Sequence, residues 1–208
     1  GFVFTIYSIH SGDVYTPEKL TCQNRIDGKM RRMDALDLNP DGYGGTYKLV
    51  GGRPSLDFVN TISWPDTERE HDWLALPENA RRWFAAMELP FPRGKTVDVT
   101  PLYKARQLLT RVLRPLAHEQ TVPEAALAEL SKAVAKAYQS RAIDPRTLAW
   151  HWPEPSTAQD ALTPLLLDAA ELVTAADHER LRYCPSCDWL FQDQTRNGQR
   201  RWCDMADC

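Results

Sequence analysis

Apolar residues recur every three or four positions through the middle of the chain, and this period is typical of amphipathic helices. The spacing predicts helices at residues 77–89 and 101–119, with Thr100 as the N-cap of the second. A third helix is expected after the capping box Thr121-x-x-Glu124. A fourth, at residues 160–182, is predicted to run directly into the first pair of C-terminal cysteines.

Shorter elements are predicted on either side of these helices. Alternating or β-prone runs indicate strands at residues 3–7, 47–50 and 147–152. Residues 55–61 read as a short helix with Ser55 as its N-cap, and residues 41–45 as a turn. The pattern predicts an α+β protein, with a mostly helical N-terminal domain that contains a small sheet.

Three regions follow from these patterns. Helical periodicity ends near residue 182, so we expect one domain at residues 46–182 and a small second domain at 183–208. Residues 1–45 read as an N-terminal extension. The residues before position 29 are either native or an artefact of the chosen gene start. Residue 1 is Gly rather than Met, and residues 29–33 contain a second plausible start of translation.

Composition narrows the class of protein. The net charge of −3 over 208 residues is unlike that of a general polyanion binder. No run of eighteen apolar residues is present, so no membrane span is expected. Four of the five cysteines lie in the last 25 residues, which is unlike the spread of a disulfide-framed secreted protein and predicts a cytoplasmic location.

The C-terminal cysteines form the most specific motif of the chain. They read C-x2-C, then fifteen residues, then C-x4-C, at Cys184, Cys187, Cys203 and Cys208. Four thiolates satisfy the tetrahedral preference of Zn²⁺ and leave no position open for a substrate. The motif therefore predicts a structural zinc site, with two disulfides as the alternative. His178 is a further possible ligand, which we interpret instead as a solvated helix residue.

The residues between the cysteine pairs predict the shape of this module. Residues 188–193 are β-prone, Asn197-Gly198 favours a hairpin turn, and residues 200–202 would form the return strand. A helix is expected to start near Cys203, which together gives a treble-clef-like finger. Trp189 and Trp202 are interpreted as its small core, with base stacking as the alternative.

Two motifs of the chain resemble those of a known bacterial family. The first reads Cys184-x2-Cys187-x-Trp189-Leu190-Phe191, then Asp193, Arg196-Asn197 and Arg200-Arg201-Trp202-Cys203-x-Met205-Ala206-x-Cys208. It resembles the CGNR-type zinc finger. The second, Gly51-Gly52-x-Pro54-x-Leu56-Asp57-Phe58-Val59-Asn60-Thr61, resembles the opening of the ABATE domain. The two domains occur together in bacterial proteins regarded as stress-induced transcription regulators.

The resemblance implies an N-terminal domain that binds an unidentified small ligand and a C-terminal zinc finger that binds DNA. The zinc ligands carry over to the four cysteines, and the DNA-binding candidates are Arg196, Asn197, Arg200 and Arg201. Arginine forks suit phosphates and guanine edges, with a solvated hairpin face as the alternative. The family motif continues past its last cysteine with Gly-Asn-Arg and a basic tail, so only weak DNA binding is expected of this chain.

Candidate ligand-binding residues lie in the upstream motif. Asp57, Asn60 and Thr61 are spaced i, i+3 and i+4, so a helix places them on one face. Arg106, on the helix at 101–119, would pair with Asp57 or act as an anion hook. The alternative is that these residues tie down the turn at Gly51 and the neighbouring backbone.

The sequence is compatible with three classes of function to different degrees. The preferred hypothesis is a transcription regulator that binds DNA, and the alternative is a finger that docks on other proteins. An enzyme is not expected, because the sequence has no nucleophile elbow, Gly-rich phosphate loop or H-E-x-x-H motif.

Overall fold

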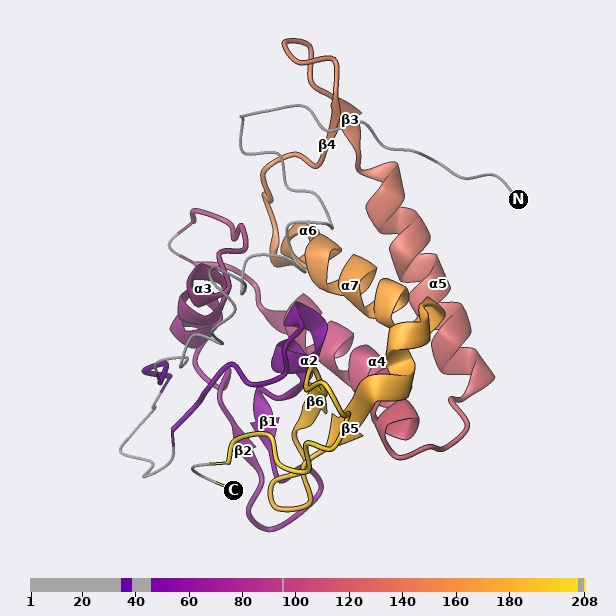
Figure 1. Ribbon diagram of the computed structural model, residues 1–208. Coiled ribbons are helices and arrows are strands. Elements are labelled where there is room, and N and C mark those ends of the chain that lie inside the picture. Colours follow the sequence, from indigo (N-terminus) through magenta and orange to yellow (C-terminus); the bar gives the residue numbers. More distant parts are fainter. Residues whose placement is uncertain (1–34, 39–45, 95, 206–207) are drawn as a thin grey trace, which may run out of the picture.

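Figure 1 shows the computed structural model, in which residues 35–38, 46–94, 96–205 and 208 are described. The strand expected at 3–7, the turn expected at 41–45 and the proposed start at 29–33 lie outside these residues. Within the described ranges, no helix combines the length and the apolar character needed to cross a membrane.

The helices form close to the predicted positions. The main ones are α3 (Pro77–Ala86), α4 (Thr100–Ala117), α5 (Glu124–Gln139) and α7 (Thr163–Thr174). Shorter helical elements are α2 (Pro54–Val59), α6 (Ala158–Ala161) and the 3₁₀ helix η1 (Ala176–Arg180). Helices α4, α5 and α7 pack against one another, and α2 lies against α4 and α7.

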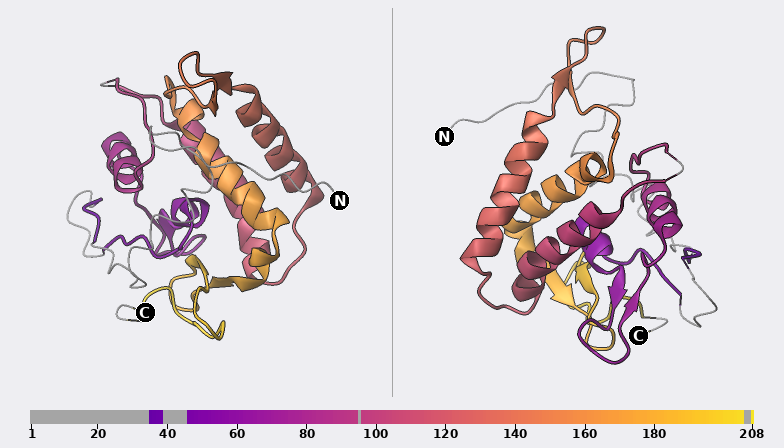
Figure 2. Two further views of the ribbon diagram at one scale, coloured as in Figure 1. Left: turned by 45° about the horizontal axis from the view of Figure 1, so that its top comes forward. Right: turned by 180° about the vertical axis from the view of Figure 1, so that it is seen from behind.

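The strands pair into short antiparallel ribbons rather than one sheet. The pairs are β1 (Ile62–Ser63) with β2 (His71–Asp72), β3 (Ala142–Ile143) with β4 (Trp150–His151), and β5 (Leu181–Tyr183) with β6 (Leu190–Gln192). Figures 1 and 2 show β1–β2 and β5–β6 at one end of the molecule and β3–β4 at the other. Helices with small antiparallel strand pairs confirm the α+β class.

Two of the predicted strands are shorter than expected. Where a strand was expected at 47–50, Tyr47 makes a single antiparallel bridge to Leu36. In the predicted strand at 147–152, only Trp150 and His151 pair with β3. A strand extends only as far as a neighbouring strand accepts and donates its backbone hydrogen bonds. Neither segment has a longer partner strand among the described residues, so both strands are short.

The predicted helix caps are wrong. Ser55 lies inside α2 and donates its hydroxyl to Asp168, while Arg53 occupies the N-cap position. Helix α4 begins at Thr100, whose backbone N–H donates to Asp98 Oδ1 at 2.9 Å. Helix α5 follows Pro123 and has no side-chain cap. A capping box does form one helix later, between Thr157 and Asp160 at the start of α6.

The long helix predicted at 160–182 is also wrong. Helix α7 ends at Thr174, η1 follows, and residues 181–183 form β5. Strand pairing explains the break, because β5 aligns Leu181 with Gln192 and Tyr183 with Leu190. Tertiary pairing therefore overrides the helical period of the sequence in this segment.

Helix α2 is buried along its whole length, although it carries polar residues. Phe58 packs on Trp83 with ring centroids 5.4 Å apart, and Leu56 is fully buried. Such a short helix would not persist alone in water, so its stability comes from the elements around it.

A buried ion pair fixes the start of α2 to α7. Arg53 Nη2 lies 2.9 Å from Asp168 Oδ1, and only 4% and 1% of these side chains are exposed. Asp168 Oδ2 also accepts hydrogen bonds from the Ser55 backbone N–H at 2.9 Å and from the Ser55 hydroxyl. Removing one partner of such a pair leaves an uncompensated buried charge.

We predict that Asp168→Ala lowers the free energy of unfolding by about 3–5 kcal/mol. Glu129→Ala is the matched control, because its pair with Arg111 has side chains that are 51% and 54% exposed. Exposed pairs contribute only about 0–1 kcal/mol. Urea unfolding of both variants checks the prediction, and equal losses would contradict the role assigned to Asp168.

Candidate metal centre

The first two cysteines lie on the turn that joins β5 to β6. The Cys184 backbone N–H donates to the Trp189 carbonyl, and the Asp188 N–H donates to the Cys184 carbonyl, each at 2.8 Å. Asp188 adopts a left-handed backbone conformation, with φ of 59°. The hairpin of this segment is therefore β5–β6 around the C-x2-C pair.

The hairpin predicted around Asn197-Gly198 is wrong, although a turn does form there. The Gly198 N–H donates to the Thr195 carbonyl at 3.2 Å, but residues 200–202 form no strand. Asp193 organises this turn instead, accepting from Thr195 N–H at 2.9 Å and from Arg200 N–H at 2.8 Å. Among residues 203–205 and 208, none is in a helix.

The four cysteine sulfurs converge on one point. All lie within 4.8 Å of one another, and Cys203 Sγ is 3.5 Å from the sulfurs of both Cys187 and Cys208. Tetrahedral Zn²⁺ with Zn–S distances of about 2.3 Å has sulfur–sulfur edges of about 3.8 Å. A disulfide would require about 2.0 Å, so the disulfide alternative does not fit. The set fits one zinc ion.

The proximity of these sulfurs also favours a bound cation. The sulfur–sulfur hydrogen bond with Cys203 lowers the pKa of Cys187 to about 6. Burial and the charge on Cys187 raise the pKa of Cys208 to about 12, and the pKa of Cys203 is raised as well. Four thiolates at this spacing repel one another unless a metal ion neutralises them.

His178, the other possible ligand, stands apart from this group. It lies in η1, and its Nδ1 is 2.6 Å from the carbonyl oxygen of Ala175, the residue before that helix. The candidate metal cluster found among the described residues contains the four cysteines alone.

Asn60 joins α2 to the cysteine-bearing hairpin. Its Nδ2 donates to the Leu190 carbonyl at 2.8 Å, and its Oδ1 accepts from the Leu190 N–H at 2.7 Å. Next to this pair, the Gln192 N–H donates to the Gly51 carbonyl at 2.8 Å. Strand β6 therefore has β5 on one side and the turn before α2 on the other, so the hairpin is fixed to the helices.

Gly51 needs to be glycine because the backbone passes close to α2. A Cβ atom at this position would lie 2.8 Å from Leu56 Cβ and 2.9 Å from the Asp57 backbone nitrogen. The Gly51 N–H donates to Asp57 Oδ1 at 2.8 Å. Asp57 thus fixes the turn whose carbonyl receives β6.

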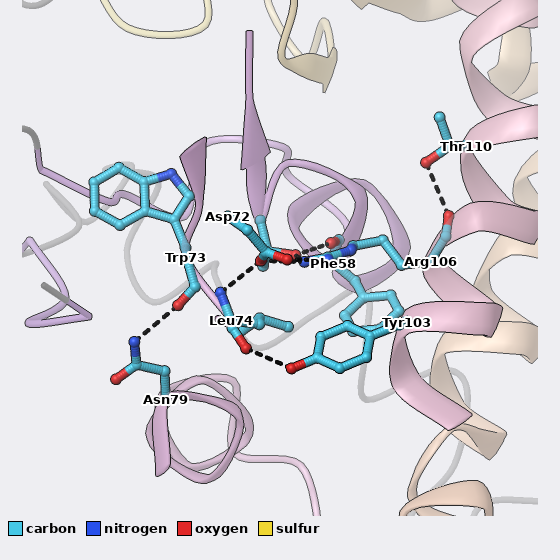
Figure 3. A network of polar contacts seen from close by, with 9 residues as sticks. Phe58, Asp72, Trp73, Leu74, Asn79, Tyr103, Arg106 and Thr110 are labelled. Atoms are coloured by element: carbon cyan, nitrogen blue, oxygen red, sulfur yellow. Dashed lines mark hydrogen bonds and ion pairs between the residues drawn. The ribbon is translucent and has the colours of Figure 1, made fainter. Parts of the chain in front are cut away.

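Arg106 pairs with Asp72 rather than with Asp57. Its guanidinium donates to the two carboxylate oxygens of Asp72 at 2.8 and 2.6 Å (Figure 3). It also donates to Thr61 Oγ1 at 2.9 Å. Thr61 in turn donates to the Phe58 carbonyl at 2.7 Å. The ligand-binding candidates therefore bond to neighbouring protein groups, which favours the packing alternative.

A basic groove lies between the end of α4 and the finger-like segment. It encloses about 490 Å³ and has His118 and Glu119 on one side. The residues that line it from the C-terminal segment include Arg182, Tyr183, Gln199, Arg200 and Arg201. The rings of His118 and Tyr183 stack with centroids 3.8 Å apart. Asp188 forms an ion pair with Arg114, and its Oδ1 lies 3.2 Å from His118 Nε2.

Of the four predicted DNA-binding residues, three are exposed and the fourth, Arg200, bonds to the protein itself. Arg196, Asn197 and Arg201 are exposed. Arg200 lies over the Phe191 ring and donates to the carbonyls of Trp202 and Cys203, so its donors hold the cysteine segment. Sequence reasoning missed Tyr183 and His118. The only available signal for Tyr183 was an aromatic residue directly before Cys184.

The buried carboxyl of Asp57 provides a pH test of this arrangement. Burial raises its pKa from 3.8 to about 7, against the opposing effect of the Gly51 hydrogen bond. Because the folded state holds this proton more tightly than the unfolded state, stability falls as pH rises through about 4 to 7 and levels off above.

We predict that the stability of the wild type relative to Asp57→Asn decreases by about 2 kcal/mol between pH 5.5 and 7.5. The variant keeps an oxygen for the Gly51 N–H but does not ionise. Urea titrations of both zinc-loaded proteins measure this difference, since contributions from the cysteines cancel. Parallel stability curves would show that Asp57 is ionised throughout this range.

Comparison with known families identifies both parts of the chain. The ABATE family, described as "Putative stress-induced transcription regulator", matches residues 52–176. The CGNR zinc finger family matches residues 180–208, which include all four cysteines. No curated protein gave a match. The ABATE match alone covers more than half of the 208 residues, so the chain belongs to the ABATE family and carries a CGNR zinc finger after that region.

Proposed function

We propose that this protein is a transcription regulator that binds DNA through its zinc finger, and that the groove beside Tyr183 is the contact surface. The groove carries the proposal, because it is concave, about 490 Å³ in volume and lined by arginines. Backbone phosphates are the main source of affinity for proteins that bind DNA, and arginine is suited to them.

Two arginines are placed to reach phosphates from this groove. Arg201 is exposed, and its guanidinium forms no hydrogen bond or ion pair with any described residue. Arg182 is held by hydrogen bonds from Nη1 to the Glu179 and Leu181 carbonyls at 2.7 and 2.9 Å. Those bonds use one nitrogen and orient the remainder of the guanidinium.

Tyr183 adds an aromatic surface between these charges. Its residue is 40% exposed, and His118 supports one side of its ring. Burial and the nearby Arg114 lower the pKa of His118. The two stacked rings provide an aromatic surface of the kind that contacts sugars and bases.

In this proposal Cys184, Cys187, Cys203 and Cys208 are the zinc ligands. When bound, the zinc ion supplies the cross-link between the β5–β6 turn and the residues after Trp202. We further propose two domains, at residues 46–182 and 183–208, and a cytoplasmic location in a bacterial cell. Because the finger is bonded to α2, the two domains would move together rather than as separate modules.

Cys184→Ser and Cys203→Ser are each predicted to reduce bound zinc from one ion per chain to none. They are also predicted to lower the thermal midpoint, because the metal supplies folding free energy to a finger of this size. Cys22→Ser is the matched control, since Cys22 lies outside the motif. Zinc is measured by elemental analysis of the purified proteins, and full retention of zinc in either variant would remove that cysteine from the ligand set.

We predict that the chain binds a random-sequence 24-base-pair duplex at 50 mM KCl and that Arg201→Ala weakens this binding. Loss of one phosphate contact should reduce the slope of log K against log salt by about 1. Arg146→Ala is the control, because Arg146 is an exposed arginine between β3 and β4. Figure 1 shows this ribbon at the opposite end of the molecule from β5 and β6. Fluorescence anisotropy over a salt series provides the measurement, and equal slopes for the two variants would reject this surface.

A protein-docking role is the second candidate, and the exposed apolar residues of the finger favour it. Met205 is 76% exposed and Tyr183 is 40% exposed. Capture of partners with and without nuclease treatment separates the two roles, because partners held only through nucleic acid are lost after digestion.

A further inference from the structure

Glu119 differs from the other charged residues of the basic groove because its charge opposes theirs. Among the described residues that line this groove, Glu119 is the acidic one, and the arginines are Arg182, Arg200 and Arg201. Glu119 is exposed, and its carboxylate forms no hydrogen bond or ion pair with any described residue. The carboxylate is therefore available to a ligand that enters the groove.

The end of α4 fixes the direction in which the Glu119 side chain leaves the backbone. The Gln120 N–H donates to the Pro115 carbonyl at 2.8 Å, and the Glu119 N–H donates to the Leu116 carbonyl at 3.1 Å. These two bonds form a Schellman motif, in which Glu119 takes the left-handed position with φ of 55°. Glycine adopts this conformation most easily, and a negative charge is unfavourable at the C-terminus of a helix.

Glu88 shows that this conformation by itself does not mark a site. It follows α3 in the same motif, with φ of 55°, and the Leu89 N–H donates to the Phe84 carbonyl at 2.9 Å. Glu88 is exposed as well, but it does not line the groove. The feature that distinguishes Glu119 is an unpaired carboxylate in a groove lined by arginines.

The chemistry of a carboxylate restricts what Glu119 can contact on DNA. A carboxylate only accepts hydrogen bonds, and phosphate oxygens offer none, so Glu119 adds nothing to affinity for the backbone. In the major groove, cytosine presents an amino group as a donor, whereas guanine and thymine present acceptors. Adenine presents an acceptor beside its donor. A carboxylate therefore favours cytosine over the other three bases.

We propose that Glu119 is a specificity-determining residue, whose carboxylate accepts a hydrogen bond from the N4 amino group of a cytosine in the major groove. This inference rests on the DNA-binding function proposed above and adds the base that the groove selects. The arginines supply affinity for the backbone, and Glu119 weakens binding to sites that lack cytosine at the contacted position. The expected preference is about tenfold, within the range of direct base contacts.

Selection from a pool of random-sequence duplexes at 50 mM KCl tests the proposal, with the zinc-loaded full chain as the binding protein. The wild type is expected to enrich cytosine at one position. Glu119→Ala removes the acceptor, so this enrichment should be lost while binding of the unselected pool stays equal or tightens. Glu119→Gln should shift the preference toward adenine, the base that glutamine contacts best.

Glu88→Ala is the matched control, because Glu88 has the same backbone conformation outside the groove. It should enrich the same sequence as the wild type. Zinc content and thermal midpoint establish that each variant is folded, and a loss of base preference in a folded variant is not explained by a structural role of Glu119.

A duplex of the selected sequence with N4-methylcytosine at the enriched position tests the contact itself. The methyl group replaces the amino hydrogen that faces the major groove and leaves the base pair intact. It should weaken binding of the wild type about tenfold and leave binding of Glu119→Ala unchanged. Fluorescence anisotropy measures both.

Two results would overturn the role of Glu119 while DNA binding stands. One is cytosine enrichment that persists in Glu119→Ala, and the other is a wild type that binds the pool but enriches no position. A wild type that does not bind the pool at all overturns the DNA-binding function and this inference together.

Discussion

The convergence of four cysteine sulfurs on one point is the constraint on which the rest of the C-terminal structure depends. The β5–β6 turn supplies two of these sulfurs, and the irregular residues after Trp202 supply the others. These last residues have no strand partner of their own among the described residues, so the metal takes the place of a hydrophobic core. Arg200 adds backbone contacts to the same segment, which explains why this arginine points inward.

Helix α2 connects this metal centre to the helices. Its first turn is fixed to α7 through Arg53 and Asp168, and its end is fixed to β6 through Asn60. Every one of these polar groups is buried, and each has a partner within the protein. A finger bonded in this way forms part of the folded body, so its groove shares a wall with the ABATE region.

The sequence predicted those features that depend on local period and on ligand chemistry. Helices α3, α4 and α5 follow the apolar spacing, and the cysteine motif specified the metal site. Residues 181–183 could not be predicted, because their helical period is overridden by pairing with β6. The partner of Arg106 was also hidden, since Asp72 reaches it only through the β1–β2 ribbon. Long-range pairing of this kind leaves no local signal in one sequence.

X-ray absorption at the zinc edge of the purified protein tests the central claim most directly. The account predicts one zinc ion per chain with four sulfur neighbours at about 2.3 Å and no nitrogen or oxygen in the first shell. A mixed shell that contains nitrogen or oxygen, or fewer than four sulfur neighbours, would contradict it. In that case the finger would be held together in some other way, and the groove would lose the support that the metal gives it.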